Sequence, residues 1–237
     1  MNTQIEITQN GTTTLATAGK YCDRNIDVNV NVEDSGGGED LVADLVQGTI
    51  SGDYFSDKVT SLKPYAFALC RDLTSVSLPN CTTFRYELSD TGSYFRYSEK
   101  LKAVNVPNLT TIENGGRAFN NCSALEEFNA PNLTYLKTTS TMFSTCRVLK
   151  KVSFPKLGGT TIDANTFANC YELETLILGG DTLNPLANVN AFNNAGLSYT
   201  GMGKIYVPDN LVDTYKTATN WSTFADKIKP MSEYVEG

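Results

Sequence analysis

The sequence contains no histidine, and this absence removes several kinds of chemistry at once. Histidine is the commonest general base in enzymes and a frequent zinc ligand. The six cysteines include no Cys-x-x-Cys pair, so a zinc site is not expected from them either. No Gly-x-Ser-x-Gly motif occurs, and the glycines at 36–38 are not followed by the Lys and Ser or Thr of a phosphate-binding loop. We therefore expect no catalytic residue, no cofactor and no metal.

Concentrated positive charge and long apolar runs are absent as well. The 237 residues include 19 Lys and Arg against 26 Asp and Glu, and no stretch gathers the basic ones. We therefore expect no nucleic-acid binding through phosphate neutralisation. No apolar run approaches the roughly 20 residues of a membrane-spanning helix. The start, Met1 to Ile7, lacks the basic and apolar regions of a signal peptide. Unless a signal has been removed, this predicts a protein that folds in the cytoplasm.

What the sequence does contain is one pattern repeated six times before Pro208. The pattern is Phe-x-x-Cys-x-x-Leu-x-x-apolar-x-apolar-Pro, and the last copy is degraded. The copies lie 28, 24, 24, 24 and 25 residues apart. They open at Phe67, Phe95, Phe119, Phe143, Phe167 and Phe192. A unit of this length cannot bury its own apolar side, so the series predicts a solenoid whose turns, or rungs, are stable only against their neighbours.

Within each copy, Leu-x-x-apolar-x-apolar is the pattern of a strand whose alternate side chains point inward. Strands of successive rungs should stack about 4.8 Å apart as a parallel sheet on one face. The phenylalanine and cysteine of each copy should then form rows on the opposite side of the core. Cysteines at this position are expected to be buried apolar filler, because parallel-pointing side chains suit disulfide geometry poorly. They are Cys70, Cys122, Cys146 and Cys170, with Ser98 interrupting the row.

The repeat resembles the BspA-like leucine-rich repeat family over residues 59–208. Its unit reads roughly ITSIGxxAFxxCxxLxxVxIP. The matching residues are Val59-Thr60-Ser61-Leu62, Ala66-Phe67, Cys70 and Leu73-Thr74-Ser75-Val76-Ser77-Leu78-Pro79. The resemblance implies an α/β solenoid that acts as a non-catalytic binding or display scaffold, on bacterial surfaces or in phage-encoded proteins. It fixes no ligand, so a protein or a surface glycan of a bacterial host both stay open as partners.

Residues 1–34 form a predicted small β module of their own. Ile5-Glu6-Ile7 and residues 26–32 alternate apolar and polar side chains, which predicts half-buried strands. About 30 residues make a poor core, so we expect this module to need a partner, which is another subunit, another protein or the repeat array. We expect it to act as an anchor and the chain to form a homo-oligomer. The candidate anchoring residues are Ile5, Ile7, Ile26, Val28, Val30 and Val32. Ile-Thr-Gln-Asn-Gly-Thr followed by Asp-Val-Asn-Val-Asn-Val resembles N-terminal modules of tailed-phage structural proteins, which implies virion proteins as its partners.

The remaining boundaries follow from composition. Residues 35–38, Ser-Gly-Gly-Gly, are a predicted flexible linker. Residues 39–58 are expected to cap the first rung, with a short helix over 39–46 because Leu41, Val42 and Leu45 have helical spacing. Residues 59–208 hold about six repeats. Residues 209–237 are expected to form a helical C-terminal cap anchored by Trp221, with a mobile tail from Met231.

The second repeat is four residues longer than those that follow it, with aromatic and basic residues on both sides of the insertion. Insertions in repeat proteins map to loops, often on a binding side, and Tyr and Arg are enriched in binding hot spots. The candidate contact residues are Arg85, Tyr86, Tyr94, Arg96 and Tyr97. Ile177 and Tyr206 join them because they occupy solvent-facing strand positions at the C-terminal end of the array. Packing beneath the longer loop is the alternative for the aromatic residues.

Two hypotheses about function follow, and both exclude catalysis. The first is a phage virion-associated protein of the tail, fibre or capsid surface, in which residues 1–34 attach to the particle and the repeats face the host. The alternative is a bacterial cell-surface adhesion protein of the BspA-like kind.

Overall fold

The structure is a computed structural model that describes residues 4–9, 12–17, 39–41, 48, 50–86, 92–199 and 203–236. Near the N-terminus, β1 (Gln4–Gln9) and β2 (Thr12–Thr17) pair as an antiparallel hairpin, with Ile5 opposite Ala16 and Ile7 opposite Thr14. The predicted linker 35–38 and four of the candidate anchoring residues lie outside the described residues. They are Ile26, Val28, Val30 and Val32. The anchoring role of this region therefore stays a prediction.

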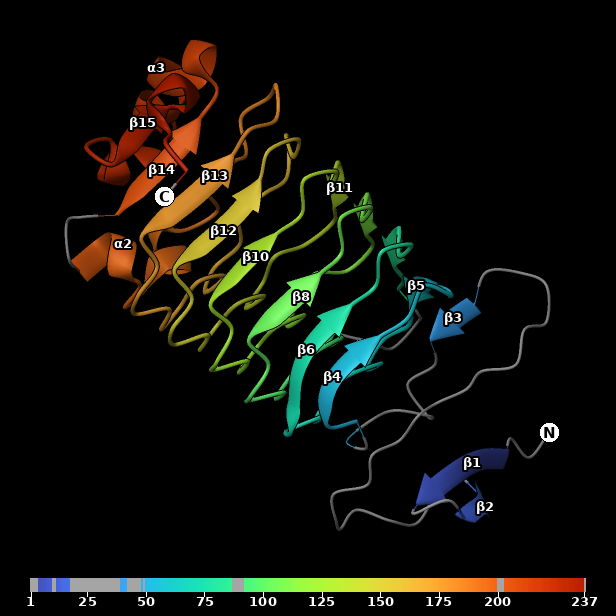
Figure 1. Cartoon of the computed structure of the whole chain (residues 1–237). Helices are drawn as coiled ribbons and strands as arrows, with labels where there is room; N and C mark the ends of the chain where they lie inside the picture. Colours follow the sequence, from blue (N-terminus) through green and yellow to red (C-terminus); the bar gives the residue numbers. More distant parts are fainter. Residues whose placement is uncertain are drawn as a thin grey trace.

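From residue 50 onward the chain winds as a solenoid with parallel strands along one face (Figure 1). Two sheets share this face, in the orders β4-β6-β8 and β10-β12-β13-β14-β15. Their strands are β4 (Gly52–Phe55), β6 (Leu73–Ser77), β8 (Ala103–Asn105), β10 (Glu127–Asn129), β12 (Lys151–Phe154), β13 (Thr175–Leu178), β14 (Lys204–Val207) and β15 (Ile228–Pro230). The predicted parallel sheet on one face is confirmed, and β15 is a strand that the repeat pattern did not indicate.

A further parallel sheet, which was not predicted, runs along another side of the solenoid. We call it the second sheet, and we call the two sheets of the first side together the main sheet. Its order is β11-β9-β7-β5-β3. The strands are β3 (Glu39–Leu41), β5 (Val59–Leu62), β7 (Thr83–Phe84), β9 (Thr111–Ile112) and β11 (Tyr135–Leu136). Asparagines after the repeat prolines tie the intervening turns together. The Nδ2 atoms of Asn80, Asn108 and Asn132 donate to carbonyls of the previous rung at 2.7, 2.8 and 2.9 Å.

The core contains the predicted row of phenylalanines. All six repeat phenylalanines are fully buried, and each ring stacks on the next with centroids 5.0–5.6 Å apart and planes within 9°. The edge of Tyr54 caps this row at one end, 5.1 Å from Phe67. At the other end, Phe192 meets Phe224 at 5.0 Å and Trp221 at 6.0 Å. The rungs are therefore joined through one continuous aromatic interior.

The cysteine row is buried as predicted and also makes hydrogen bonds. The thiols of Cys122, Cys146 and Cys170 donate to the carbonyl of the previous rung's phenylalanine at 3.0–3.1 Å. Ser98 makes the same bond to Phe67 at 2.6 Å, which explains how serine replaces cysteine in this row. Burial raises the pKa of Cys170 to about 12. These thiols are therefore protonated donors inside the core, well away from the thiolate form that reacts.

The predicted helix over residues 39–46 is wrong at its start. Residues 39–41 form β3, which pairs with β5, and residues 42–47 lie outside the described part of the chain. Three apolar residues at helical spacing are a weak signal for a helix. A strand at 39–41 pairs with the backbone N–H and C=O groups at the edge of β5, which a helix would leave unpaired. Further on, β4 pairs with β6. Strands, rather than the expected helix, thus lie beside the first repeat.

After the fifth repeat the structure becomes less regular. It contains η1 (Val189–Phe192), α2 (Gly196–Tyr199), η2 (Asp209–Leu211), α3 (Val212–Thr217), η3 (Trp221–Phe224) and η4 (Met231–Glu233). Trp221 is fully buried, and its indole N–H donates to the Asn184 carbonyl at 2.7 Å. The Tyr215 hydroxyl accepts from the Asn184 backbone N–H at 2.9 Å. One buried asparagine therefore links this segment to the repeats.

Candidate functional site

The outer face is defined here as the solvent side of the strands β4 to β14. Two residues of each strand project onto it. In β8 and β10 these residues are all exposed: Ala103, Asn105, Glu127 and Asn129. In β12, β13 and β14 the second of these positions is buried, as Ser153, Ile177 and Tyr206, while Lys204 at the first position of β14 is exposed. The outer face thus has an open part and a covered part.

The predicted exposure of Ile177 and Tyr206 is wrong, because the C-terminal tail covers this end of the outer face. Ile177 is 4% exposed and Tyr206 is 8% exposed. The ring of Tyr234 lies edge-on to Tyr206, with centroids 5.0 Å apart. These contacts also contradict the expectation of a mobile tail. We call residues 231–236 the tail strap.

Lys151 on β12 fastens the end of the tail strap. Its ammonium lies 3.4 Å from the Glu236 carboxylate and 5.4 Å from the centre of the Tyr234 ring. The pKa of Lys151 is raised, first by its hydrogen bond with Tyr234 and further by Glu236. The charged form of Lys151 is therefore stabilised, and it contacts both Tyr234 and Glu236 of the tail strap.

The open part of the outer face lies where the sheet divides. Strands β8 and β10 are neighbours in the solenoid but belong to different sheets (Figure 1). At the equivalent position of adjoining rungs, Leu78 N–H donates to Asn105 and Ala130 N–H to Ser153. Within the described residues, no such bond joins the Val106 N–H to the Asn129 carbonyl. One ladder bond remains, from the Glu126 N–H to the Lys102 carbonyl at 3.3 Å, so the backbone ladder between these two rungs is interrupted at the Val106 end.

A change of side-chain volume accompanies this interruption. The first inward strand position holds Val104 in β8 and Phe128 in β10, and the second holds Val106 followed by Ala130. Phe128 is fully buried and packs on Phe119 at 4.6 Å. The same change from Val to Phe separates Phe128 from Val152, where β10 and β12 pair in register, so side-chain volume alone does not interrupt the ladder. Val104 keeps 7% exposure, whereas Val76 before it and Phe128 after it in this row have 1% and 0%.

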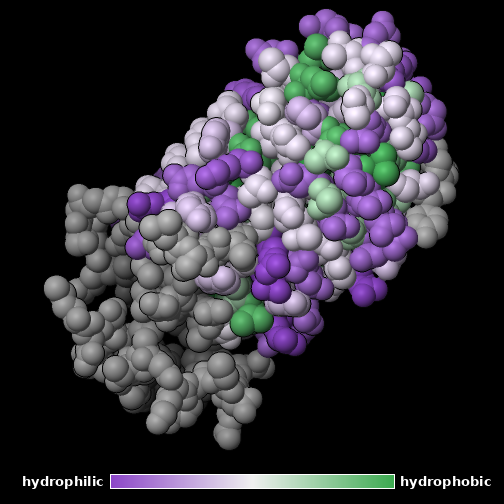
Figure 2. Space-filling model, turned by 180° about the vertical axis from the view of Figure 1, so that it is seen from behind, coloured by the Kyte–Doolittle hydropathy of each residue, from purple (hydrophilic) through white to green (hydrophobic). Residues whose placement is uncertain are grey.

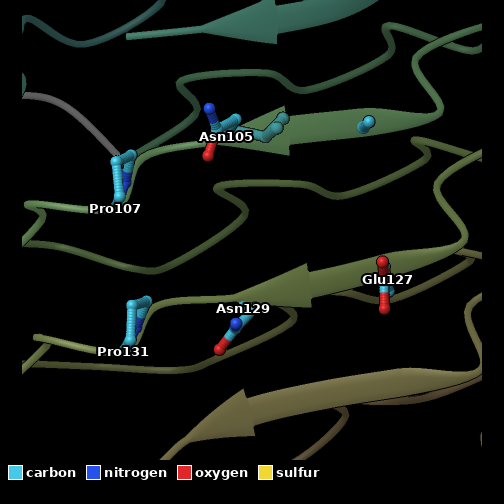
Figure 3. A pocket seen from close by; sticks show the side chains of 7 residues that line it. Asn105, Pro107, Glu127, Asn129 and Pro131 are labelled. Atoms are coloured by element: carbon cyan, nitrogen blue, oxygen red, sulfur yellow. The ribbon is translucent and has the colours of Figure 1, made fainter. Parts of the chain in front are cut away.

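A groove of about 290 Å³ opens at this interruption (Figure 3). Its lining combines apolar and polar side chains: Ala103, Val104, Asn105, Pro107, Glu127, Asn129 and Pro131. The Asn105 amide nitrogen donates to Ser77 Oγ at 3.1 Å. Within the described part of the chain, the side chains of Glu127 and Asn129 have no hydrogen-bond or ion-pair partner. These two side chains are the polar groups that a ligand in the groove would find available.

The residues predicted beside the insertion do not form one site. Arg85 and Tyr86 follow β7 and are exposed; Tyr86 retains 39% of its surface and has the ammonium of Lys137 5.5 Å from its ring. Tyr94 was wrongly expected at the surface, because it is fully buried against Phe84 and its hydroxyl donates to the Arg85 carbonyl at 2.7 Å. For this aromatic residue, packing beneath the loop is the correct alternative.

Arg96 and Tyr97 lie in the turn beside the phenylalanine row and engage each other. The guanidinium carbon of Arg96 lies 4.6 Å from the centre of the Tyr97 ring, and its Nη2 donates to the Tyr97 hydroxyl at 3.2 Å. Both are half-buried. The seven predicted contact residues therefore fall into three separate regions, and none of them lines the groove.

Figure 2 shows a mixed surface with small, separated apolar areas. In the described ranges, no three His, Cys, Asp or Glu residues are placed to hold a metal ion. The same ranges contain no helix with the length and apolar character needed to cross a bilayer. The groove thus remains the candidate binding site.

Comparison with known proteins agrees with the repeat geometry. The family profile described as BspA type leucine rich repeat region matches residues 49–174 and 89–220, with six copies. No curated protein shows significant similarity to the chain. The family indicates a protein of the binding or adhesion type. Because the matched region covers well over half of the sequence, the chain belongs to the BspA-type leucine-rich repeat family.

Proposed function

We propose that this protein is a non-catalytic binding protein that uses the open part of its outer face to contact a bacterial surface. The observation that carries the proposal is the groove at the β8–β10 interruption, with Glu127 and Asn129 unengaged by the protein. The stacked phenylalanines beneath hold these strands in place, so a partner meets a preformed surface. Binding would then require little ordering of the protein.

We further propose that the protein is associated with a phage particle, with residues 1–34 as the attachment module and the repeats turned toward the host. The resemblance of this module to tailed-phage structural proteins and its alternating apolar residues support this placement. The second candidate is a bacterial cell-surface adhesion protein, which the BspA-type repeat supports directly. In both cases the array presents the same groove.

Cell binding by the full chain tests the shared part of the proposal. Labelled protein should bind a susceptible bacterial strain saturably, and the double variant Glu127→Gln with Asn129→Ala should bind at least tenfold more weakly. Glu126→Gln is the matched control, because it makes the same chemical change beside the groove without lining it. Absence of saturable binding across a broad strain panel, or equal binding by all three proteins, would contradict the proposal.

An antibody raised against the full chain distinguishes the two placements. Labelling of purified phage particles supports the virion assignment, whereas labelling of washed, uninfected cells supports the adhesion protein. Mass spectrometry of the same particles provides an independent measurement of incorporation.

A further inference from the structure

We infer that the groove between β8 and β10 binds a neutral saccharide of one or two sugar rings. This inference rests on the proposed function and names the chemical class of its ligand. It combines the interruption of the sheet, the mixed lining of the groove and the charge around it.

The size of the groove sets an upper limit on the ligand. Its volume of about 290 Å³ lies at the lower end of small-molecule sites, which typically run from about 300 to 1,000 Å³. The groove is therefore too small for a folded domain or a bulky helix. An extended peptide that adds a strand needs room for that strand between two sheet edges, whereas β8 and β10 remain directly adjacent across the break. The groove also contains no Tyr, Trp or Arg, the usual anchors of a protein interface.

The lining supplies the two kinds of contact that a sugar ring needs. Val104 and the rings of Pro107 and Pro131 offer apolar surface for the C–H face of a sugar. The Glu127 carboxylate accepts hydrogen bonds from hydroxyl groups, while the Asn129 amide both donates and accepts. Both side chains arise from β10 (Figure 3). A ligand that combines hydroxyls with an apolar face matches this pattern better than a purely apolar one.

The existing contacts of the neighbouring side chains leave these groups available. The amide nitrogen of Asn105 is used by Ser77, which leaves its carbonyl oxygen as a further acceptor at the groove. Lys151 stands beside Glu127 in the strand register, but its ammonium is engaged by Glu236 and Tyr234. Glu127 is thus a carboxylate without a bound cation among the described residues.

The charge at the groove selects against anionic ligands. Glu127 is the only ionisable residue in its lining, and the whole chain carries a net charge of −7. A sulfated or carboxylated sugar would place like charges close together, which costs binding energy even in a partly aqueous site. Anionic sugars are thereby disfavoured, and a neutral sugar places hydroxyl groups where the carboxylate accepts hydrogen bonds.

Saturation-transfer NMR and calorimetry with the full chain test this inference. The neutral probes are maltose, cellobiose, lactose and N,N′-diacetylchitobiose, and a heparin disaccharide is the anionic control. At least one neutral probe should bind, the heparin disaccharide should not, and Glu127→Gln with Asn129→Ala should weaken the binding at least tenfold. Glu126→Gln should bind as the unmodified chain does. No binding by any neutral probe, or binding that the groove variant leaves unchanged, overturns the inference.

Competition in the cell assay separates this inference from the proposed function. If the chain binds cells through the groove but excess neutral sugar does not compete and no probe binds, the saccharide inference fails while the surface-binding function stands. The occupant is then a protein or a second copy of the chain. If a neutral sugar binds the groove but no cell is recognised, the inference holds and the proposed function fails.

Discussion

The two parts of the outer face have equivalent repeat positions and opposite surroundings. Asn129 on β10 faces solvent, whereas Ile177 and Tyr206, at the same position on β13 and β14, are buried. The repeat determines that all three project outward. Residues outside the repeat, above all Tyr234, determine that two of them are covered. The direction of a side chain in a solenoid is therefore a local property, but its exposure is not.

The same division separates interrupted from continuous backbone pairing. Strands β8 and β10 are three residues long and lie in different sheets, whereas β12, β13 and β14 have four residues each and pair in register. The covered part is supported on its outer side by the tail strap and at its end by β15. The open part has neither support, and this is where the groove lies. Substitutions in the C-terminal segment that supports the covered part therefore test whether the two parts differ in local stability.

Trp221→Ala should have the largest effect. The indole is fully buried, contacts Phe192 and Tyr215, and donates to Asn184. Its loss should lower the free energy of unfolding by about 3–5 kcal/mol, as measured by urea denaturation. Hydrogen exchange should show that protection falls more in β14 and β15 than in β8 and β10. Trp221→Phe, which keeps an aromatic ring, should lose less. A uniform fall in protection would mean that the two parts unfold as one unit.

Tyr234→Ala should have a smaller and more local effect. It removes the contact with Tyr206 and the ring above Lys151, which should cost about 1 kcal/mol of stability. Amide exchange in β13 and β14 should accelerate, while exchange in β8 and β10 stays unchanged. Tyr135→Ala is the matched control, because this tyrosine is exposed on the second sheet. Unchanged exchange in β14 would show that the tail strap contributes no protection there.

The repeated features of the fold could be predicted from the sequence, because each appears several times in register. The spacing of the phenylalanines, the buried cysteines and the main parallel sheet follow from one 24-residue pattern. The second sheet also had a recurring signal that was missed. Cys81-Thr82-Thr83-Phe84, Leu109-Thr110-Thr111-Ile112 and Leu133-Thr134-Tyr135-Leu136 share an apolar residue, a threonine and a second apolar residue at fixed spacing. Two-residue strands are too short for alternation to reveal them.

The groove and the tail strap could not be predicted in this way, because each depends on contacts between distant residues. The groove lies where the Val106 N–H and the Asn129 carbonyl of adjacent rungs do not pair. The strap depends on Lys151 meeting Glu236, 85 residues further along the chain. Among the candidate contact residues, the aromatic type of Tyr94 suggested binding, but Tyr94 is fully buried against Phe84. Residue type alone therefore selected the wrong region.

Acidification should have the smallest effect on local stability. Asp53 at one end of the outer face and Asp209 near the other allow the two ends to be compared. Asp53 on β4 accepts from the hydroxyls of Thr74 and Ser75 at 2.6 and 2.7 Å, and these bonds, first that of Thr74, lower its pKa. Asp209 accepts from Ser232, and these bonds lower its pKa too. Since both folded-state pKa values lie below the usual 3.8, each contribution is complete above that pH and is lost as the pH falls further.

We therefore expect amide exchange near β4 and in the tail strap to rise relative to the central strands when the pH falls from 6 to 3, after correction for intrinsic rates. Asp53→Asn should remove the pH dependence near β4 and leave the tail strap unchanged. Asp209→Asn should reduce it in the tail strap and leave β4 unchanged. Both carboxylates are exposed, so each change should be small. If either variant altered both ends equally, the ends would be coupled through the array, and the contrast between the open and covered parts would not be local.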